Sequence, residues 1–197
     1  MPKIIQLPDP ELQGTLSLEA ALARRRSVRE FSDEPLTLAE VGQLLWAAQG
    51  ITHPEGYRTA PSAGALYPLE IYAATPDGLF HYEPPEHRLA TLGRQDARPA
   101  LYEAAHRQEA VLQAPLVIVM AAAYSRTAAK YGEQRGPRYV HLDVGHAAQN
   151  VLLQAVALDL GAAPVGAFED AEVVEALGLP ADQQPVYLIP VGHAASQ

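Results

Sequence analysis

The groups best suited to bind an anion are four arginines within the six residues Arg24–Arg29 (RRRSVR), in a chain that has only two lysines. Guanidinium forks beside the hydroxyl of Ser27 are the donors that a terminal phosphate requires, so this segment is a candidate phosphate site. Taken alone, a simpler interpretation is more common: cations at the C-terminal end of a helix complement its dipole and lie in solvent. Both interpretations place the segment at the end of a helix that begins near Leu16.

Two segments of small residues could approach a flat ligand closely. The first, Ala60–Pro68 (APSAGALYP), allows backbone N–H and C=O groups to reach a planar ring, although a surface loop entering a strand is the commoner case. The second, Ala162–Phe168 (AAPVGAF), is not followed by Gly-Lys-Ser/Thr, and no GxGxxG occurs in the chain. Phosphate loops and adenine-dinucleotide sites are therefore weakly supported.

Lys130 and Tyr131 are a candidate pair for proton transfer. A tyrosine beside a lysine can share protons with it, and a partly buried amine is a better base, so the pair could supply general-base catalysis. A surface lysine is the alternative. Since the chain has only two lysines, composition does not decide between these interpretations.

Two other kinds of site are disfavoured by spacing. His141 and His146 lie five residues apart, on different faces of a helix, and neither belongs to an HExxH motif, so a metal site is not expected. Ser62, Asp143 and His193 follow the order of an α/β-hydrolase triad, but Ser62 lacks the GxSxG turn. The chain contains no cysteine, which excludes thiolate chemistry.

Composition predicts one folded domain over residues 1–197. Hydrophobic residues make up 48% and charged residues 19%, which is ordinary globular usage, and the formal charge of -9 disfavours nucleic acid as a partner. The first 13 residues lack the apolar run of a signal peptide, and no apolar run is long enough to span a membrane. We therefore expect a cytoplasmic protein that has no membrane partner.

The elements that must position these groups follow from periodicity and end signals. Thr37 and Glu40 form a capping box that predicts a helix ending at Gly50. Apolar spacing predicts further helices over Arg98–Gln113, Arg138–Leu160 and Ala171–Leu177. Apolar and β-branched runs predict strands over Leu69–Ala74, Leu79–Tyr82, Pro115–Ala122 and Val186–Val191. Because these elements do not alternate as βαβ units, the chain is predicted to be α+β.

Five motifs, taken in order, resemble the nitroreductase-like flavoproteins. They are RRSVREF (Arg25–Phe31), APSAGALYP (Ala60–Pro68), KYGEQRGPRYVHLDVGHAAQN (Lys130–Asn150), LGAAPVGAFED (Leu160–Asp170) and PVYLIPVGH (Pro185–His193). They are most similar to the SagB-type branch, which includes the FMN-dependent azoline dehydrogenases that form thiazoles and oxazoles in peptides. The resemblance implies an α+β homodimer with a central antiparallel sheet flanked by helices, a long central helix, and two FMN sites at the subunit interface.

The same resemblance assigns roles to individual residues. The FMN phosphate and ribityl chain would be bound by Arg25, Arg26, Ser27 and Arg29, with His193 as the only basic group of the C-terminal segment. The isoalloxazine ring would be lined from the other subunit by Pro61, Ser62, Ala63 and Gly64. Its opposite edge, near N5, would be lined by Pro164, Val165, Gly166 and Ala167, and Asp143 and Asn150 would lie near the ring. Lys130-Tyr131 matches the catalytic Lys-Tyr pair of azoline dehydrogenases.

The function predicted from the resemblance is that of an FMN-dependent oxidoreductase of SagB type. A base at Lys130 or Tyr131 would remove a proton from carbon while a hydride moves to flavin N5, and the substrate would be a small molecule or a peptide. One alternative is a nitro or quinone reductase that uses NAD(P)H. Two others are a flavin-binding module without turnover and, disfavoured above, a hydrolase that uses Ser62.

Overall fold

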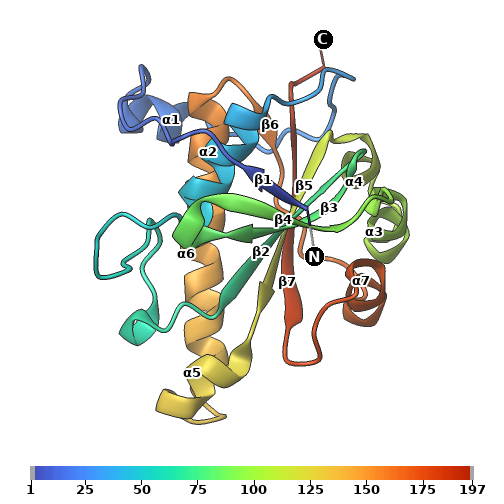
Figure 1. The fold of residues 1–197 in the computed structure, drawn as a ribbon. Helices are drawn as coiled ribbons and strands as arrows, with labels where there is room; N and C mark the ends of the chain where they lie inside the picture. Colours follow the sequence, from blue (N-terminus) through green and yellow to red (C-terminus); the bar gives the residue numbers. More distant parts are fainter. Residues whose placement is uncertain (1–2, 196–197) are drawn as a thin grey trace.

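The computed structural model describes residues 3–195, and within them the chain forms a seven-stranded sheet (Figure 1). The strand order is β1-β4-β3-β2-β5-β7-β6, and neighbouring strands are antiparallel throughout. The strands are β1 (Ile4–Gln6), β2 (Leu69–Thr75), β3 (Gly78–Glu83), β4 (Arg88–Gly93), β5 (Leu116–Ala122), β6 (Gly161–Ala162) and β7 (Gln184–Gly192). The predicted α+β fold with a central antiparallel sheet is therefore confirmed.

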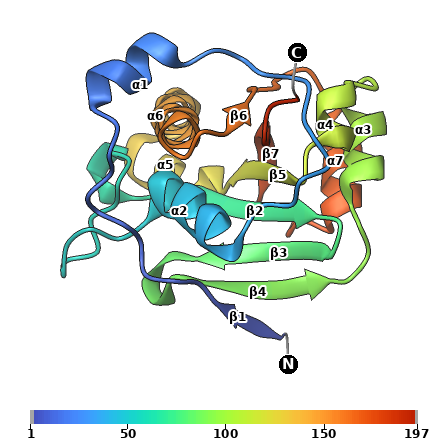
Figure 2. The ribbon, with the colours of Figure 1, turned by 90° about the horizontal axis from the view of Figure 1, so that it is seen from above.

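Helices cover both faces of the sheet (Figure 2). On one side lie α1 (Leu18–Arg24), α2 (Leu38–Gln49), α5 (Tyr124–Tyr131) and the 22-residue α6 (Gly136–Ala157). On the other side lie α3 (Arg98–Ala104), α4 (Glu109–Gln113) and α7 (Asp170–Leu177). Two short 3-10 helices, η1 (Ala63–Ala65) and η2 (Pro84–Glu86), complete the described elements.

Strand β5 lies at the centre of the fold, and every residue in it is buried. Its side chains alternate between the two hydrophobic cores: Ile118 and Met120 pack with the α2–α6 side, whereas Val117 and Val119 pack with the α3–α7 side. A strand with both faces covered needs apolar residues at every position. This explains why its sequence is an unbroken apolar run, and the prediction of a buried strand is confirmed.

Local end signals set the bounds of α2 and α6. Glu40 Oε2 accepts from Thr37 N at 2.7 Å, and Thr37 Oγ1 accepts from Glu40 N at 3.2 Å, which confirms the capping box of α2. Helix α6 begins at Gly136, before Pro137 in its first turn, and not at Arg138. It ends at Ala157 and does not continue to Leu160, because Asp159 adopts a left-handed conformation with φ 59°.

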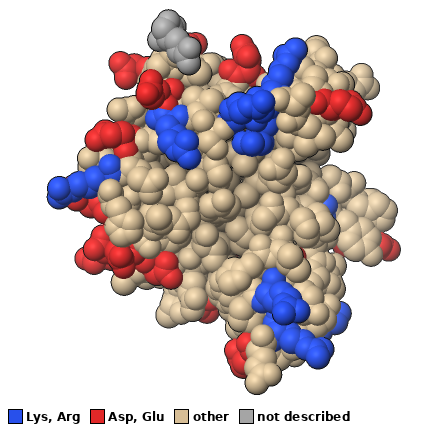
Figure 3. All heavy atoms as spheres, turned by 180° about the vertical axis from the view of Figure 1, so that it is seen from behind, with Lys and Arg blue, Asp and Glu red and all other residues tan. Residues whose placement is uncertain are grey.

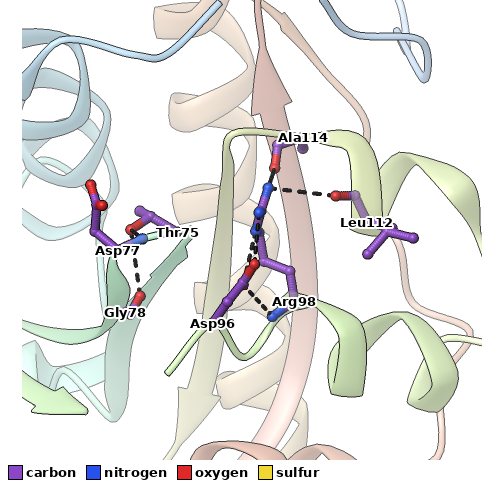
Figure 4. Close-up of polar contacts among 7 residues, drawn as sticks. All are labelled: Thr75, Asp77, Gly78, Asp96, Arg98, Leu112 and Ala114. Atoms are coloured by element: carbon purple, nitrogen blue, oxygen red, sulfur yellow. Dashed lines mark hydrogen bonds and ion pairs between the residues drawn. The ribbon is translucent and has the colours of Figure 1, made fainter. Parts of the chain in front are cut away.

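The prediction of one helix over residues 98–113 is wrong. His106 and Arg107 have φ of 54° and 60°, and this left-handed turn separates α3 from α4. Arg98 ties the two pieces together: Nη2 lies 2.7 Å from Asp96 Oδ2, and Nη1 donates to Ala114 O at 2.8 Å (Figure 4). The apolar residues of α3 and α4 keep a helical spacing across this turn, because both short helices pack their apolar residues on the same face of the sheet.

Several elements were not anticipated from the sequence. Strand β4 follows a left-handed residue at His87 and mixes polar with apolar residues, and β1 adds to its outer edge. Helix α5 lacks the usual N-cap signal, since Ala123 occupies that position and makes no side-chain cap. Among the helices in the described part of the chain, none combines the length and apolar character that a bilayer crossing requires.

Helix α6 joins two distant parts of this fold (Figure 1). Helix α5 packs at its beginning, where the rings of Tyr131 and Tyr139 have centroids 4.5 Å apart. Helix α1 packs near its end, where Ala21 and Leu153 line the same cavity. This cavity of about 590 Å³ lies between α1, α2 and α6.

Candidate functional site

A buried carboxylate fixes the Ala60–Pro68 segment to α6. Asp143 is only 4% exposed, and its Oδ2 accepts a 2.6 Å hydrogen bond from Ser62 Oγ, while Oδ1 accepts from Ala63 N at 3.4 Å. Ser62 Oγ in turn accepts from Tyr67 N at 2.9 Å. These bonds close residues 62–67 into a loop that is seated on α6.

The backbone of this loop is strained. Gly64, Ala65 and Tyr67 all lie in the left-handed region, with φ of 64°, 53° and 46°. For a residue other than glycine such a conformation costs on the order of 1–3 kcal/mol, so other contacts must hold it. Tyr67 is held by Arg58, whose N–H donates to Tyr67 Oη at 3.2 Å and whose guanidinium lies 4.6 Å from the ring centroid. The loop is thus fixed in shape before any ligand arrives.

Lys130 and Tyr131 converge on Gly64 of this loop. A Cβ atom added at Gly64 would lie 2.7 Å from Lys130 Nζ and 2.8 Å from Tyr131 Oη, so any side chain at this position would displace the pair. The structure therefore brings together a set that we name the lysine–tyrosine cluster: Pro61, Ser62, Ala63, Gly64, Lys130, Tyr131 and Asp143. Asn150, two turns beyond Asp143 on α6, donates to Thr59 O at 3.2 Å just before this loop.

A second set forms around the arginines. Val28 N donates to Ala162 O at 3.0 Å, which lays the segment containing Arg25–Arg29 alongside β6. The approach is so close that a Cβ atom at Gly161 would lie 2.6 Å from Val28 Cγ1. Ser32 N donates to His193 O at 2.9 Å, which brings the end of β7 to the same segment. We name this set the arginine cluster: Arg25, Arg26, Ser27, Arg29, Pro164, Val165, Gly166, Ala167 and His193.

The arginines differ in their partners. Arg26 Nη1 donates to Ala23 O at 3.0 Å and to Arg25 O at 2.7 Å, so this guanidinium binds carbonyls at the end of α1. The simpler interpretation of the segment, cations at a helix end, therefore holds for Arg26. Arg25 is half-buried and Arg29 is exposed.

The turn at residues 164–167, which follows the β6 residue Ala162 bonded to Val28, presents backbone donors. Val165 is buried and fixed by Leu188 through N–H to carbonyl bonds of 2.8 and 3.0 Å. The following Gly166 and Ala167 are exposed, and within residues 3–195 their amides donate to no backbone carbonyl. Small side chains with unused N–H groups are suited to the polar edge of a planar ligand.

Among residues 3–195 no hydrogen bond joins the two clusters within one chain. The lysine–tyrosine cluster is bonded to α6 at Asp143, and α1, which leads into the arginines, packs against the region of Leu153–Leu158. Asp143 and Ala157 are 14 residues apart, about 21 Å along a helix axis. Figure 3 likewise shows basic side chains near the upper edge and near the lower end of one face, separated by an uncharged area.

The positions of the candidate side chains do not support a hydrolase triad or a metal site. Ser62 bonds to Asp143 directly, whereas His193 Nε2 lies 3.9 Å from carboxylate oxygens of Glu34 and Glu40, so the three residues do not form a triad. Among residues 3–195, no three His, Cys, Asp or Glu side chains are grouped so that they could hold a metal ion.

Neither Arg58 as the partner of the loop nor the role of Tyr67 in holding it was predicted from the sequence. Tyr67 belongs to the small-residue motif, but nothing in the sequence indicates that it adopts a left-handed conformation. Arg58 gives no sequence signal, because its partners Tyr67 and Gln49 lie on segments that only the fold brings beside it.

Comparison with known proteins shows a consistent relationship. The model of the Nitroreductase family matches residues 22–193 of the chain. The chain is 45% identical to a candidate nitroreductase of Methanocaldococcus jannaschii over 195 residues, which cover 96% of each protein. The crystal structure of a candidate nitroreductase from Ralstonia eutropha superposes with a TM-score of 0.90 at 32% identity, over 98% of this chain and 90% of that one. A candidate nitroreductase from Anabaena variabilis gives a TM-score of 0.84 at 28% identity, over 98% of this chain and 42% of that longer one.

The buried carboxylate should give a characteristic dependence of stability on pH. Burial raises the pKa of Asp143 above its ordinary value, and the hydrogen bonds from Ser62 and Ala63 only partly oppose this. The stability gained from the protonated form is present below the ordinary carboxyl range and is lost as pH rises through the raised pKa. The free energy of unfolding of the wild type minus that of Asp143→Asn should therefore increase as the pH is lowered from neutral. Urea titrations across this range measure it, and a difference that stays flat or shrinks on acidification would contradict it.

Proposed function

The chain belongs to the Nitroreductase family and is an oxidoreductase, and on that premise we propose that it is an FMN-dependent dehydrogenase of SagB type. The observation that carries the proposal is the convergence of Lys130 and Tyr131 on Gly64 in the small-residue loop. A pair of proton-transferring groups held beside a loop of small residues is suited to remove a carbon-bound proton next to a planar ring.

The residues present are suited to FMN. In the proposed complex Arg25, Ser27 and Arg29 bind the phosphate, since guanidinium forks and a hydroxyl complement a dianion. The exposed amides of Gly166 and Ala167 are available to the polar edge of the ring. FMN, when bound, supplies the hydride acceptor for the reaction.

A complete site is proposed to need two copies of the chain. In one chain no hydrogen bond among residues 3–195 joins the two clusters, and Asp143, which holds the loop, lies about 21 Å along α6 from Ala157, near which α1 packs. After Arg138 the only acidic or basic side chain of α6 other than histidine is Asp143, which is buried, and Leu142 is 51% exposed. An uncharged helix face with an exposed leucine is suited to contact a second copy. In the proposed homodimer Pro61–Gly64 of one subunit lines the ring bound by the arginine cluster of the other.

The proposed reaction is a two-electron oxidation of a carbon–heteroatom ring or a similar substrate. Lys130 or Tyr131 would accept the proton that leaves one carbon, and bound FMN would supply the acceptor for the hydride from the neighbouring carbon. Because Gly64 carries no side chain, Lys130 and Tyr131 can lie directly against the backbone of the loop.

Reduction of nitro compounds or quinones at the expense of NAD(P)H is the second candidate function. It is favoured by the name of the Methanocaldococcus jannaschii relative, a candidate nitroreductase that is 45% identical to this chain. This reaction uses the same cofactor site but needs no base, so the role of Lys130 and Tyr131 distinguishes the two. Membership of an enzyme family disfavours a flavin-binding module without turnover.

Hybrid dimers test whether the site is shared. Arg25→Ala/Arg29→Ala breaks the arginine cluster, and Gly64→Ala breaks the loop. If each site combines the arginines of one subunit with the loop of the other, a hybrid of the two variants has one site with both defects and one intact site. Separated hybrids should therefore bind FMN at half of the wild-type stoichiometry, whereas each variant homodimer binds weakly. Hybrids without any tight site, or a monomer that retains FMN, would contradict the shared site.

Arg25→Ala and Arg29→Ala should each weaken FMN binding by about 1.5–3 kcal/mol, the usual loss for a hydrogen bond to a charged group. Riboflavin lacks the phosphate and should bind the variants nearly as well as it binds the wild type. Fluorescence titration of both flavins makes the comparison. Equal losses for FMN and riboflavin would show that these arginines act on the fold and not on the phosphate.

Lys130→Ala and Tyr131→Phe should lower dehydrogenation of a thiazoline-containing peptide about 10²–10⁴-fold, the usual contribution of a general base. FMN content and dimerisation should be unchanged, because the phosphate contacts lie in the arginine cluster. Transfer of electrons from the reduced protein to a quinone requires no carbon-bound proton to leave, so it is the internal control and should barely change. Variants that oxidise the peptide at the wild-type rate, or a wild type that does not oxidise it, would favour the reductase.

A further inference from the structure

Helix α5, which carries Lys130 and Tyr131, is bonded near its beginning to the end of the loop and to the residues that follow it. Ala123 N donates to Pro68 O at 2.9 Å just before the helix begins. One turn later Arg126 Nη1 donates to Tyr67 O at 3.1 Å, and Arg126 Nη2 pairs with Glu70 Oε1. The helix therefore runs antiparallel to residues 64–70 and reaches Gly64 with its last turn.

Arg126 is placed on α5 so that it can fix the alignment of this helix with residues 64–70. It lies four residues before Lys130, so both side chains project from the same face of the helix, one turn apart. Arg126 binds the residue at one end of the loop, Tyr67, while Lys130 lies against Gly64 within it. Rotation or sliding of α5 would break the first contact and displace the second.

Glu70 is itself held in place as the partner of Arg126. It belongs to β2, and His81 Nε2 of the neighbouring β3 lies 2.8 Å from its Oε2. Burial alone would raise the pKa of the Glu70 carboxyl, but the bonds from His81 and Arg126 bring it below its ordinary value. Glu70 is therefore ionised at neutral pH and offers Arg126 a fixed charge on the sheet.

We propose that Arg126 is a positioning residue that holds α5 in register with the loop, so that Lys130 and Tyr131 meet the substrate over Gly64. This inference rests on the proposed function of the Lys130–Tyr131 pair and extends it to a residue that does not touch the substrate. Two different nitrogens of one guanidinium bind a backbone carbonyl and a carboxylate. A lysine ammonium is a single point charge and does not reproduce this fork.

The Arg126 side chain is 43% exposed, and a partly exposed ion pair contributes little to overall stability, so global unfolding is not the informative measurement. Hydrogen exchange of the α5 amides, residues 124–131, reports the anchoring directly and needs no substrate. In the FMN-loaded protein Arg126→Gln should speed this exchange about fivefold or more, and Arg126→Lys should have a smaller effect. The matched control is Arg107→Gln, which removes the exposed Arg107–Glu103 pair and should leave α5 unchanged.

The kinetic measurement tests whether that anchoring serves the reaction. With the thiazoline-containing peptide, Arg126→Gln should lower kcat about 10- to 100-fold with little change in KM, since small misplacement of a catalytic group costs rate and not binding. Arg126→Lys should recover part of the loss, and quinone reduction should be unaffected in both.

The outcomes separate this inference from the proposed function. Unchanged exchange in Arg126→Gln would overturn the positioning role, and so would faster exchange with normal kcat while Lys130→Ala is inactive. If Lys130→Ala is fully active, the proposed function fails, and the exchange result alone then decides whether Arg126 holds α5 against the loop.

Discussion

The fixed length of one helix is the constraint on which the rest of the structure depends. Each residue of α6 adds about 1.5 Å, so its 22 residues separate what packs at its beginning from what packs near its end. At the beginning lie α5 and the loop bonded to Asp143; near the end lies α1, which leads into the arginines. No loop movement shortens a helix, and this rigidity is the physical basis for proposing that a complete flavin site combines two chains.

Several features of the lysine–tyrosine cluster and its loop lower the stability of the fold but define the shape of the loop. A buried carboxylate and left-handed Ala65 and Tyr67 are all unfavourable by themselves. They persist because each is held by specific partners: Ser62 and Ala63 donate to Asp143, and Arg58 holds Tyr67. The result is a loop whose only residue without a side chain faces the two groups proposed to move the proton. Strain that is offset in this way is typical of a pre-organised site.

Some of the fold could be predicted because the signal was local. The capping box at Thr37, the apolar run of β5 and the long periodic segment of α6 each encode an element within about 20 residues. The break between α3 and α4 could not be predicted in the same way. Its apolar spacing continues across His106 and Arg107, and the Arg98 bonds that fix the break join residues up to 16 positions apart.

The sequence by itself determined which chemical groups the protein has, the order of its motifs and the family they resemble, because residue types and short spacings are properties of the chain. Only the tertiary structure decided how those groups combine. Ser62 and Asp143 are 81 residues apart and Arg126 and Glu70 are 56 apart, yet each pair is hydrogen-bonded. Such contacts depend on how the sheet and α6 pack, and no local pattern encodes them. The same packing fixes the loop to α6 at Asp143 and the arginine segment to β6 at Ala162, and the order of the motifs along the chain encodes neither contact.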